Sequence, residues 1–240
     1  MRHNTKGVVL HCFKYSDSSL IVRVFTQDLG IKSFIVKGVR SKKSKLNINV
    51  LRSLSLIDME VYSKNGADDH LGNLVFYSSA TIAVKEDFAK SAITIFIAEL
   101  LYKCIEEGDA NISLFQFLWN SVLELQESER YLNFHLVFMI RLTKYLGFLP
   151  NNEGDLKGAR FNINEGVFVS LPQSNDHCMS LSSSVILASL MQVAVDKHQS
   201  VELTLGERND LVDQLLLFYN AQLPNMKQIN SHLILREVMC

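Results

Sequence analysis

The sequence predicts an α+β protein of two domains, a five-stranded β-barrel over residues 1–80 followed by an all-helical domain over residues 81–240. Two observations carry this prediction. Short runs rich in β-branched residues, separated by turns, fill the first 80 residues, and apolar residues recur at spacings of three to four from about residue 82 onward. A chain of 240 residues, 48% of them hydrophobic, is long enough for two cores.

Five segments in the first domain are expected to be strands. The fourth alternates, with Ile57, Met59 and Val61 on one face and polar residues between them. The residues Asp28-Leu29-Gly30 form a short connection between the second and third segments, with glycine where a positive φ is often needed. Short strands at this spacing favour a barrel, because closure removes most exposed strand edges. The expected strands are 7–12, 20–27, 31–37, 54–62 and 71–77.

The second domain is expected to be helical. Ala89, Ile93, Phe96 and Leu100 follow the spacing of one helix face. Gly147, with Pro150 just beyond it, is a common helix stop. Residues 151–180 are rich in Asn, Gly and Ser and contain one strand-like piece at 166–171. The expected helices are 89–104, 114–125, 131–146, 184–195, 207–219 and a short one near 229–238.

Charge is distributed unevenly along the chain. Residues 1–52 hold eleven Lys or Arg and two Asp, a net charge of +9, whereas residues 53–240 hold thirteen basic and twenty-three acidic residues, a net charge of −10. No acidic residue occurs between Leu29 and Ile57. Such asymmetry indicates a polyanion-binding region. The alternative is a solvated face that acidic residues of the other domain neutralise.

A basic patch on the barrel is the candidate nucleic-acid site, because each cation that neutralises a phosphate releases condensed counterions. Aromatic side chains could add base stacking, and the candidates are Phe25, Phe34, Tyr62 and Tyr77, for which core packing is the alternative. Tyr62 shares its predicted face with Asp58 and Glu60, which would repel phosphate. The candidate DNA-binding residues are Arg23, Lys32, Lys37, Arg40, Lys42, Lys43 and Lys45.

No catalytic motif is present in the sequence. It contains no P-loop, no GxGxxG, no GxSxG and no HExxH. The four cysteines are widely spaced, which fits reduced thiols better than a disulfide framework. The first residues lack the apolar core of a signal peptide, and we expect a cytoplasmic protein. We therefore expect no catalytic residues and no enzyme activity.

Several short motifs spread over the chain form a series. The most specific part is Thr26 with Gly30, followed by Lys37-Gly38-Val39-Arg40 and a basic Ser/Lys run at 41–46. Further matches are Gly7-Val8-Val9-Leu10, Tyr15-Ser16-Asp17-Ser18-Ser19-Leu20, Tyr145-Leu146-Gly147-Phe148-Leu149-Pro150, Phe161, Glu165-Gly166-Val167-Phe168 and His232-Leu233-Ile234-Leu235-Arg236-Glu237-Val238. This series resembles the RecO family of bacterial DNA repair proteins over nearly the whole chain.

The resemblance implies a barrel of the oligonucleotide-binding (OB) type and a helical C-terminal domain. Members of the family bind single- and double-stranded DNA, anneal complementary strands, and act with RecR, and often RecF, to load RecA onto DNA coated by single-strand-binding protein. The helical domain would then receive the acidic C-terminal tail of single-strand-binding protein, and Arg141 and Lys144 are candidate contacts for it. By resemblance, the DNA contacts would be Lys37, Arg40, Lys42, Lys43 and Lys45.

One departure from the family concerns zinc. Many members carry two CxxC pairs after the helix end that matches residues 145–150, but residues 151–180 contain only Cys178. We therefore expect the zinc site to be lost, no metal or other cofactor to bind, and ordinary packing to hold this segment.

Two alternative functions belong to other classes. A metal-dependent nuclease would use Asp68 and Asp69 with a divalent ion, although Asn65-Gly66-Ala67-Asp68-Asp69 reads more simply as a hairpin turn. An adaptor would bind anionic membrane surfaces through the basic run, but no apolar anchor flanks that run. We expect no membrane partner.

Overall fold

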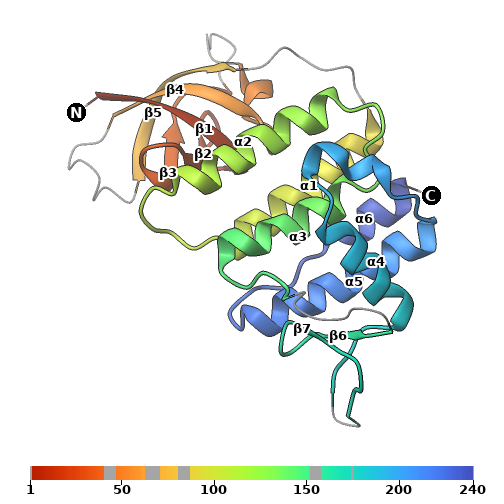
Figure 1. Cartoon of the computed structure of the whole chain (residues 1–240). Helices are drawn as coiled ribbons and strands as arrows, with labels where there is room; N and C mark the ends of the chain where they lie inside the picture. Colours follow the sequence, from red (N-terminus) through yellow and green to blue (C-terminus); the bar gives the residue numbers. More distant parts are fainter. Residues whose placement is uncertain are drawn as a thin grey trace. The chain divides into compact units, whose positions relative to one another are not determined.

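The computed structural model describes residues 2–40, 47–62, 71–80, 87–151, 158–173 and 176–239, without the side chain of Gln199. Lys42, Lys43, Lys45, Asp68 and Asp69 lie outside these residues. The chain divides into two compact units, Met1–Leu123 and Glu124–Cys240. The colours of Figure 1 follow this order, with the strands of the first unit in red to orange and the last helices in blue.

The first unit contains a closed barrel with strand order β1-β2-β3-β5-β4. Neighbouring strands are antiparallel except β3 and β5, which pair in parallel over three residue pairs, from Ser33 with Leu71 to Ile35 with Asn73. A short 3-10 turn, η1 (Ile48–Leu51), precedes β4. The strands are β1 (Arg2–Lys14), β2 (Leu20–Thr26), β3 (Gly30–Val36), β4 (Leu56–Tyr62) and β5 (Leu71–Ser79).

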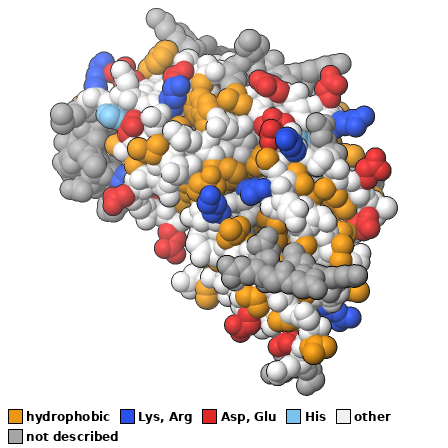
Figure 2. Space-filling model, viewed as in Figure 1, with side chains coloured by type: hydrophobic (Ala, Val, Ile, Leu, Met, Phe, Trp, Pro, Cys, Tyr) orange, Lys and Arg blue, Asp and Glu red, His pale blue; other side chains and the backbone are white. Residues whose placement is uncertain are grey.

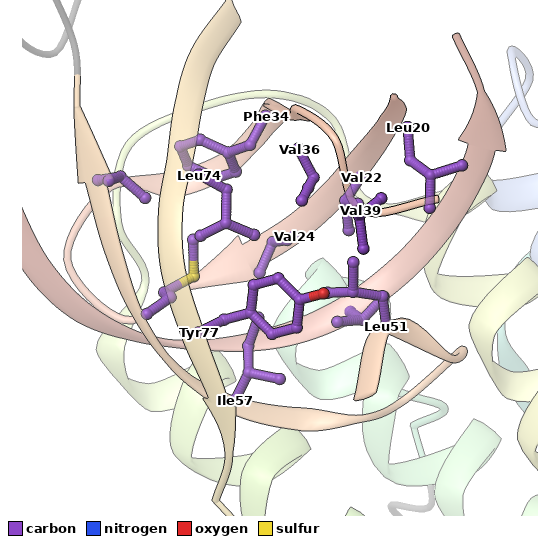
Figure 3. Packing of buried hydrophobic residues seen from close by; sticks show 13 residues of the cluster. Leu20, Val22, Val24, Phe34, Val36, Val39, Leu51, Ile57, Leu74 and Tyr77 are labelled. Carbon is purple, nitrogen blue, oxygen red and sulfur yellow. The ribbon is translucent and has the colours of Figure 1, made fainter. Parts of the chain in front are cut away.

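Alternate residues of each strand fill the barrel. Ile57, Met59 and Val61 are at most 3% exposed, whereas Asp58 and Tyr62 point to solvent, so the predicted alternation is confirmed. Figure 3 shows the interior side chains converging from all five strands and from η1. The cluster comprises Val9, Leu20, Val22, Val24, Phe34, Val36, Val39, Leu51, Ile57, Met59, Val61, Leu74 and Tyr77.

Two helices belong to the first unit, α1 (Phe88–Cys104) and most of α2 (Ile112–Glu127). The Asp87 carboxylate caps α1 by accepting from the backbone N–H groups of Ala89 and Lys90, at 2.9 and 3.1 Å. Outward-facing Phe25 is only 2% exposed, because its ring packs 6.1 Å from that of Phe115 in α2. One outer wall of the barrel is thus covered by helices.

The second unit is built around α3, whose Phe134, Val137, Phe138 and Leu142 are at most 1% exposed. Tyr219 donates from its buried hydroxyl to the Met139 carbonyl at 2.7 Å. The elements of this unit are α3 (Phe134–Leu146), β6 (Arg160–Asn162), β7 (Val167–Val169), α4 (Leu181–Met191), the 3-10 segment η3 (Val195–Ser200), α5 (Leu205–Gln222) and α6 (Ser231–Val238).

Apolar packing and backbone hydrogen bonds hold the segment around β6. Phe161, Ile163 and Met179 are at most 1% exposed. The Met179 N–H donates to the Phe161 carbonyl at 2.8 Å, and the Phe161 N–H donates to Ser184 Oγ at 2.9 Å. Among the described residues, no three His, Cys, Asp or Glu side chains gather as a metal site would require.

The predicted fold class, a five-stranded OB-type barrel followed by a helical C-terminal region, is confirmed. The predicted domain boundary at residue 80 stays a prediction. The compact unit that contains the barrel also includes the chain up to Leu123. In the described part of the chain, no helix combines the length and apolarity needed to cross a bilayer.

Candidate nucleic-acid interface

Two of the predicted cations lie together at one end of the barrel, where β1 turns into β2 and β3 ends. Lys37 directly follows Val36, which pairs with Leu20 at the start of β2. The Arg40 N–H donates to the Ser18 carbonyl at 3.1 Å, which ties the chain after β3 to the β1–β2 turn. Both side chains are exposed. We call this region, Lys14–Ser19 with Lys37–Arg40, the basic end.

The β1–β2 turn adds two side chains that the sequence analysis did not select. Lys14 is exposed and its ammonium lies 3.1 Å from the fully exposed Asp17 carboxylate. Tyr15 is 59% exposed, and its backbone N–H donates to the Ser19 carbonyl at 3.1 Å. An aromatic residue next to a lysine in a turn was the sequence signal that could have identified these two side chains as candidates.

The predicted loop lysines Lys42, Lys43 and Lys45 lie outside the described residues, but both neighbours of their segment are placed. Arg40 is tied to the β1–β2 turn, as described above. On the other side, the Tyr77 hydroxyl donates to the Asn47 carbonyl at 3.1 Å. Burial, and more weakly the nearby Cys12, raise the pKa of Tyr77 to about 12, so its hydroxyl stays protonated as a donor at neutral pH.

Arg23 lies on a different part of the barrel. Its guanidinium carbon is 4.9 Å from the centroid of the Tyr102 ring, a cation–π contact. Its Nη2 lies 3.6 Å from Glu107 Oε1, and the side chain is 19% exposed. Arg23 is therefore packed beneath α1 and the segment that follows it.

Lys32 also lies away from the basic end. It is half-buried and pairs in register with Val24, close to the β2–β3 turn. Five residues of extended chain, about 16 Å, separate it from Lys37. The structure thus brings Lys37 and Arg40 together and leaves Arg23 and Lys32 apart from them.

Of the four aromatic candidates, three lie in packed interiors. Phe25, Phe34 and Tyr77 are at most 5% exposed. Tyr62 is 39% exposed on the outer face of β4. Its neighbour Glu60 forms an ion pair with Arg2 at 2.9 Å, which offsets part of the negative charge expected there.

Arg2, Lys14 and Arg23 each have an ion-pair partner, whereas Lys37 and Arg40 have none among the residues that the structure describes. On the face shown in Figure 2, Lys and Arg side chains are spread among acidic and apolar groups instead of forming one large patch. In the basic end, the exposed Lys37 and Arg40 therefore have no ion pair to a described residue, while Lys14 is paired with Asp17.

In the second unit, the two candidate cations differ in availability. The Arg141 guanidinium donates twice to the Val193 carbonyl, at 2.7 and 3.1 Å, so it serves an internal contact. Lys144 is exposed at the end of α3. Of the two, Lys144 is the one whose charge faces solvent.

The chain matches two family models, described as Recombination protein O N terminal over residues 1–79 and Recombination protein O C terminal over residues 85–229. It is similar to the DNA repair protein RecO of Azobacteroides pseudotrichonymphae genomovar. CFP2, with 32% identity over 244 residues. It is 33% identical over 245 residues to the DNA repair protein RecO of Flavobacterium johnsoniae and 32% identical over 241 residues to that of Bacteroides fragilis. Each of these alignments covers 99% of both chains.

Proposed function

This chain belongs to the RecO family of DNA repair proteins, and on that premise we propose that it acts as a recombination mediator. In this role it binds single- and double-stranded DNA, anneals complementary strands, and helps to load RecA on DNA coated by single-strand-binding protein. The observation that carries the proposal for this chain is the basic end, where Lys37 and Arg40 face solvent and form no ion pair with a described residue.

The proposed chemistry is electrostatic. Lys37 and Arg40, together with Lys42, Lys43 and Lys45 of the adjoining segment, neutralise phosphates and release counterions. Arg23 and Lys32 remain proposed contacts on other parts of the barrel. Because phosphates occur on every strand, this binding has little sequence preference and serves both strands of a pair during annealing. No covalent bond is made or broken.

The proposed partners are RecR, the acidic C-terminal tail of single-strand-binding protein and, as in many members of the family, RecF. Lys144 is the candidate for the acidic tail, since Arg141 already donates to the Val193 carbonyl. The Lys144→Ala variant should bind a peptide of this acidic tail more weakly than the wild type does, while its DNA binding at low salt should stay unchanged.

The test of DNA binding is fluorescence anisotropy of a labelled single-stranded oligonucleotide across a salt series. Lys37→Ala/Arg40→Ala is compared with Lys197→Ala/Lys227→Ala, which removes the same charge from exposed positions of the second unit. We expect the first pair to weaken binding and to reduce the slope of log K against log salt by about 1.4, the value for two phosphate contacts on a single strand.

Three results would contradict the proposal. One is that both double variants behave alike, because the basic end would then have no special role. Another is that the wild type fails to bind at low salt. The third is magnesium-dependent cleavage of the oligonucleotide, which would favour the nuclease alternative with Asp68 and Asp69. If binding behaves as expected, annealing of complementary strands is assayed next with the same variants.

A further inference from the structure

A row of rings leads from the basic end to Arg23, along the turn after β1, the outer face of β1 and the neighbouring α1. Tyr15 is 59% exposed at the basic end, and Phe13 is 44% exposed two residues earlier. The ring centroids of Phe13 and His11 lie 5.9 Å apart, and those of His11 and Tyr102 lie 5.1 Å apart. Tyr102 is the ring on which the Arg23 guanidinium rests. The row therefore connects the basic end with Arg23.

Strand geometry explains why His11 and Phe13 share a face. A β-bulge between Val9 and His11 shifts the register, so that His11 pairs with Arg23 and Phe13 pairs with Ile21. From the bulge onward, Cys12 packs against the barrel core while His11 and Phe13 face outward. The bulge thus places the outward row beside Arg23.

The spacing of the row suits an unpaired strand. Residues two apart on an extended strand lie about 6.8 Å from each other. A stacked strand of a duplex advances only about 3.4 Å per nucleotide. Successive bases can reach successive rings only after they have been unstacked and separated, and paired bases have no free face to offer. The row therefore selects for single strands.

Arg23 is poorly satisfied where it stands. Its Nε is buried and makes no hydrogen bond to any residue that the structure describes. Its one described ion pair, to Glu107, has a long distance of 3.6 Å. A guanidinium offers five N–H donors in a planar fork that matches two oxygens of a phosphate. A phosphate would satisfy Arg23 better than this single long contact.

Glu107 lies on the segment between α1 and α2, which is fixed against the barrel. Gly30, with φ +65°, lies so close to this segment that a Cβ there would be 2.2 Å from the Gly108 carbonyl oxygen. The Glu107 side chain itself is 56% exposed, so it can swing away from Arg23 without unpacking the segment. The Glu107 carboxylate is therefore an anion beside Arg23 that can be exchanged for another.

We propose that an unpaired DNA strand runs along the outer face of β1, with bases stacked on Tyr15 and Phe13 and a phosphate on Arg23 in place of the Glu107 carboxylate. This inference rests on the proposed DNA-binding function and adds the path of the single strand and a competing internal anion. Charge complementarity supports this occupant, because Lys37 and Arg40 stand at one end of the row and Arg23 at the other.

The first experiment tests the rings. Phe13→Ala/Tyr15→Ala is compared with Phe76→Ala, which removes a 54% exposed ring from β5. Stacking on aromatic rings stabilises bound single strands, and for these half-exposed rings we expect about a fivefold loss of single-strand affinity per ring. The salt slope and the affinity for duplex DNA should stay unchanged, since no cation is removed. Retained duplex binding also shows that the variant is folded.

The second experiment tests the competing carboxylate. Glu107→Gln is compared with Glu106→Gln, which removes the same charge from the exposed neighbouring position. We expect Glu107→Gln to raise single-strand affinity about two- to fivefold, the range of an exposed ion pair, and Glu106→Gln to do less. In an Arg23→Gln background, the gain from Glu107→Gln should disappear.

The outcomes separate this inference from the proposed function. If the wild type binds DNA through Lys37 and Arg40 but the ring variant matches Phe76→Ala, or loses duplex binding equally, the path along β1 is wrong and the function stands. If Glu106→Gln and Glu107→Gln raise affinity equally, the effect comes from the general loss of negative charge near the DNA, and the proposed phosphate site at Arg23 is wrong. If no form of the protein binds DNA, both the function and the inference fail.

Discussion

His135 shows how a single buried residue sets a pH limit on the second unit. It lies in α3 with 2% of its surface exposed. Burial, and more weakly the charge of Arg208, lower its pKa from 6.5 to about 3. Between pH 6.5 and about 3, this imidazole is therefore neutral in the folded protein but protonated in the unfolded chain. Stability is unaffected above pH 6.5 and falls as the pH drops from 6.5 toward 3.

The corresponding prediction compares wild type with His135→Leu by urea denaturation at pH 7 and pH 5. Between these values the wild type should lose about 2 kcal/mol of unfolding free energy that the variant retains, because each pH unit below 6.5 costs about 1.4 kcal/mol. His177→Gln, on an exposed loop, is the control. An equal pH dependence in wild type and His135→Leu would show that His135 is protonated in the folded state.

At the scale of elements, most boundaries were predictable because apolar alternation and helical spacing are local signals. The strand β1 is longer than predicted, spanning Arg2–Lys14, because its polar first residues pair with β4 from Arg2 opposite Tyr62 onward. That pairing depends on a strand far along the chain, so no local pattern announced it. The three-residue β6, Arg160–Asn162, was missed since so short a segment carries no period.

The close packing of the segment after α1 on the β2–β3 turn gives an element-scale prediction. Gly30→Ala should destabilise the protein by about 2–4 kcal/mol, because the position combines φ +65° with a Cβ 2.2 Å from the Gly108 carbonyl oxygen. Gly38→Ala is the matched control, since it has φ +69° and no atom within 4 Å of the added Cβ. Its cost should be about 1 kcal/mol. Thermal unfolding measures both, and similar losses would show that the segment yields to the methyl group.

The candidate site was less predictable than the fold for a physical reason. Lys37 and Arg40 are neighbours in sequence, so their shared position followed directly from the end of a strand. The partner of Arg23 is Glu107, and nothing local in either segment reveals that contact. Likewise, whether an outward aromatic such as Phe25 or Phe13 meets solvent depends on which wall of the barrel the helices cover.

At the scale of the whole molecule, the division of the chain can be tested with fragments. The first compact unit extends to Leu123, and α2 ends at Glu127. A fragment of residues 1–127 should unfold cooperatively, whereas residues 1–80 would expose apolar wall residues such as Phe25 and should aggregate or unfold without a sharp transition. Circular dichroism during heating distinguishes the two. A cooperative transition for residues 1–80 would show that the barrel is stable without its helices.

The short contact between β3 and β5 has a consequence for the motion of the barrel. These strands share three residue pairs in parallel, whereas β2 and β3 pair along their full length from Leu20 to Thr26. Parallel pairing is slightly weaker per residue, so among the described residues this seam holds the fewest and weakest cross-strand bonds. The barrel should therefore open first between β3 and β5, forming a curved sheet transiently while the other strand pairs stay intact. The weakest pairing of the barrel would then lie along β3, the strand that ends at Val36 just before Lys37 and Arg40.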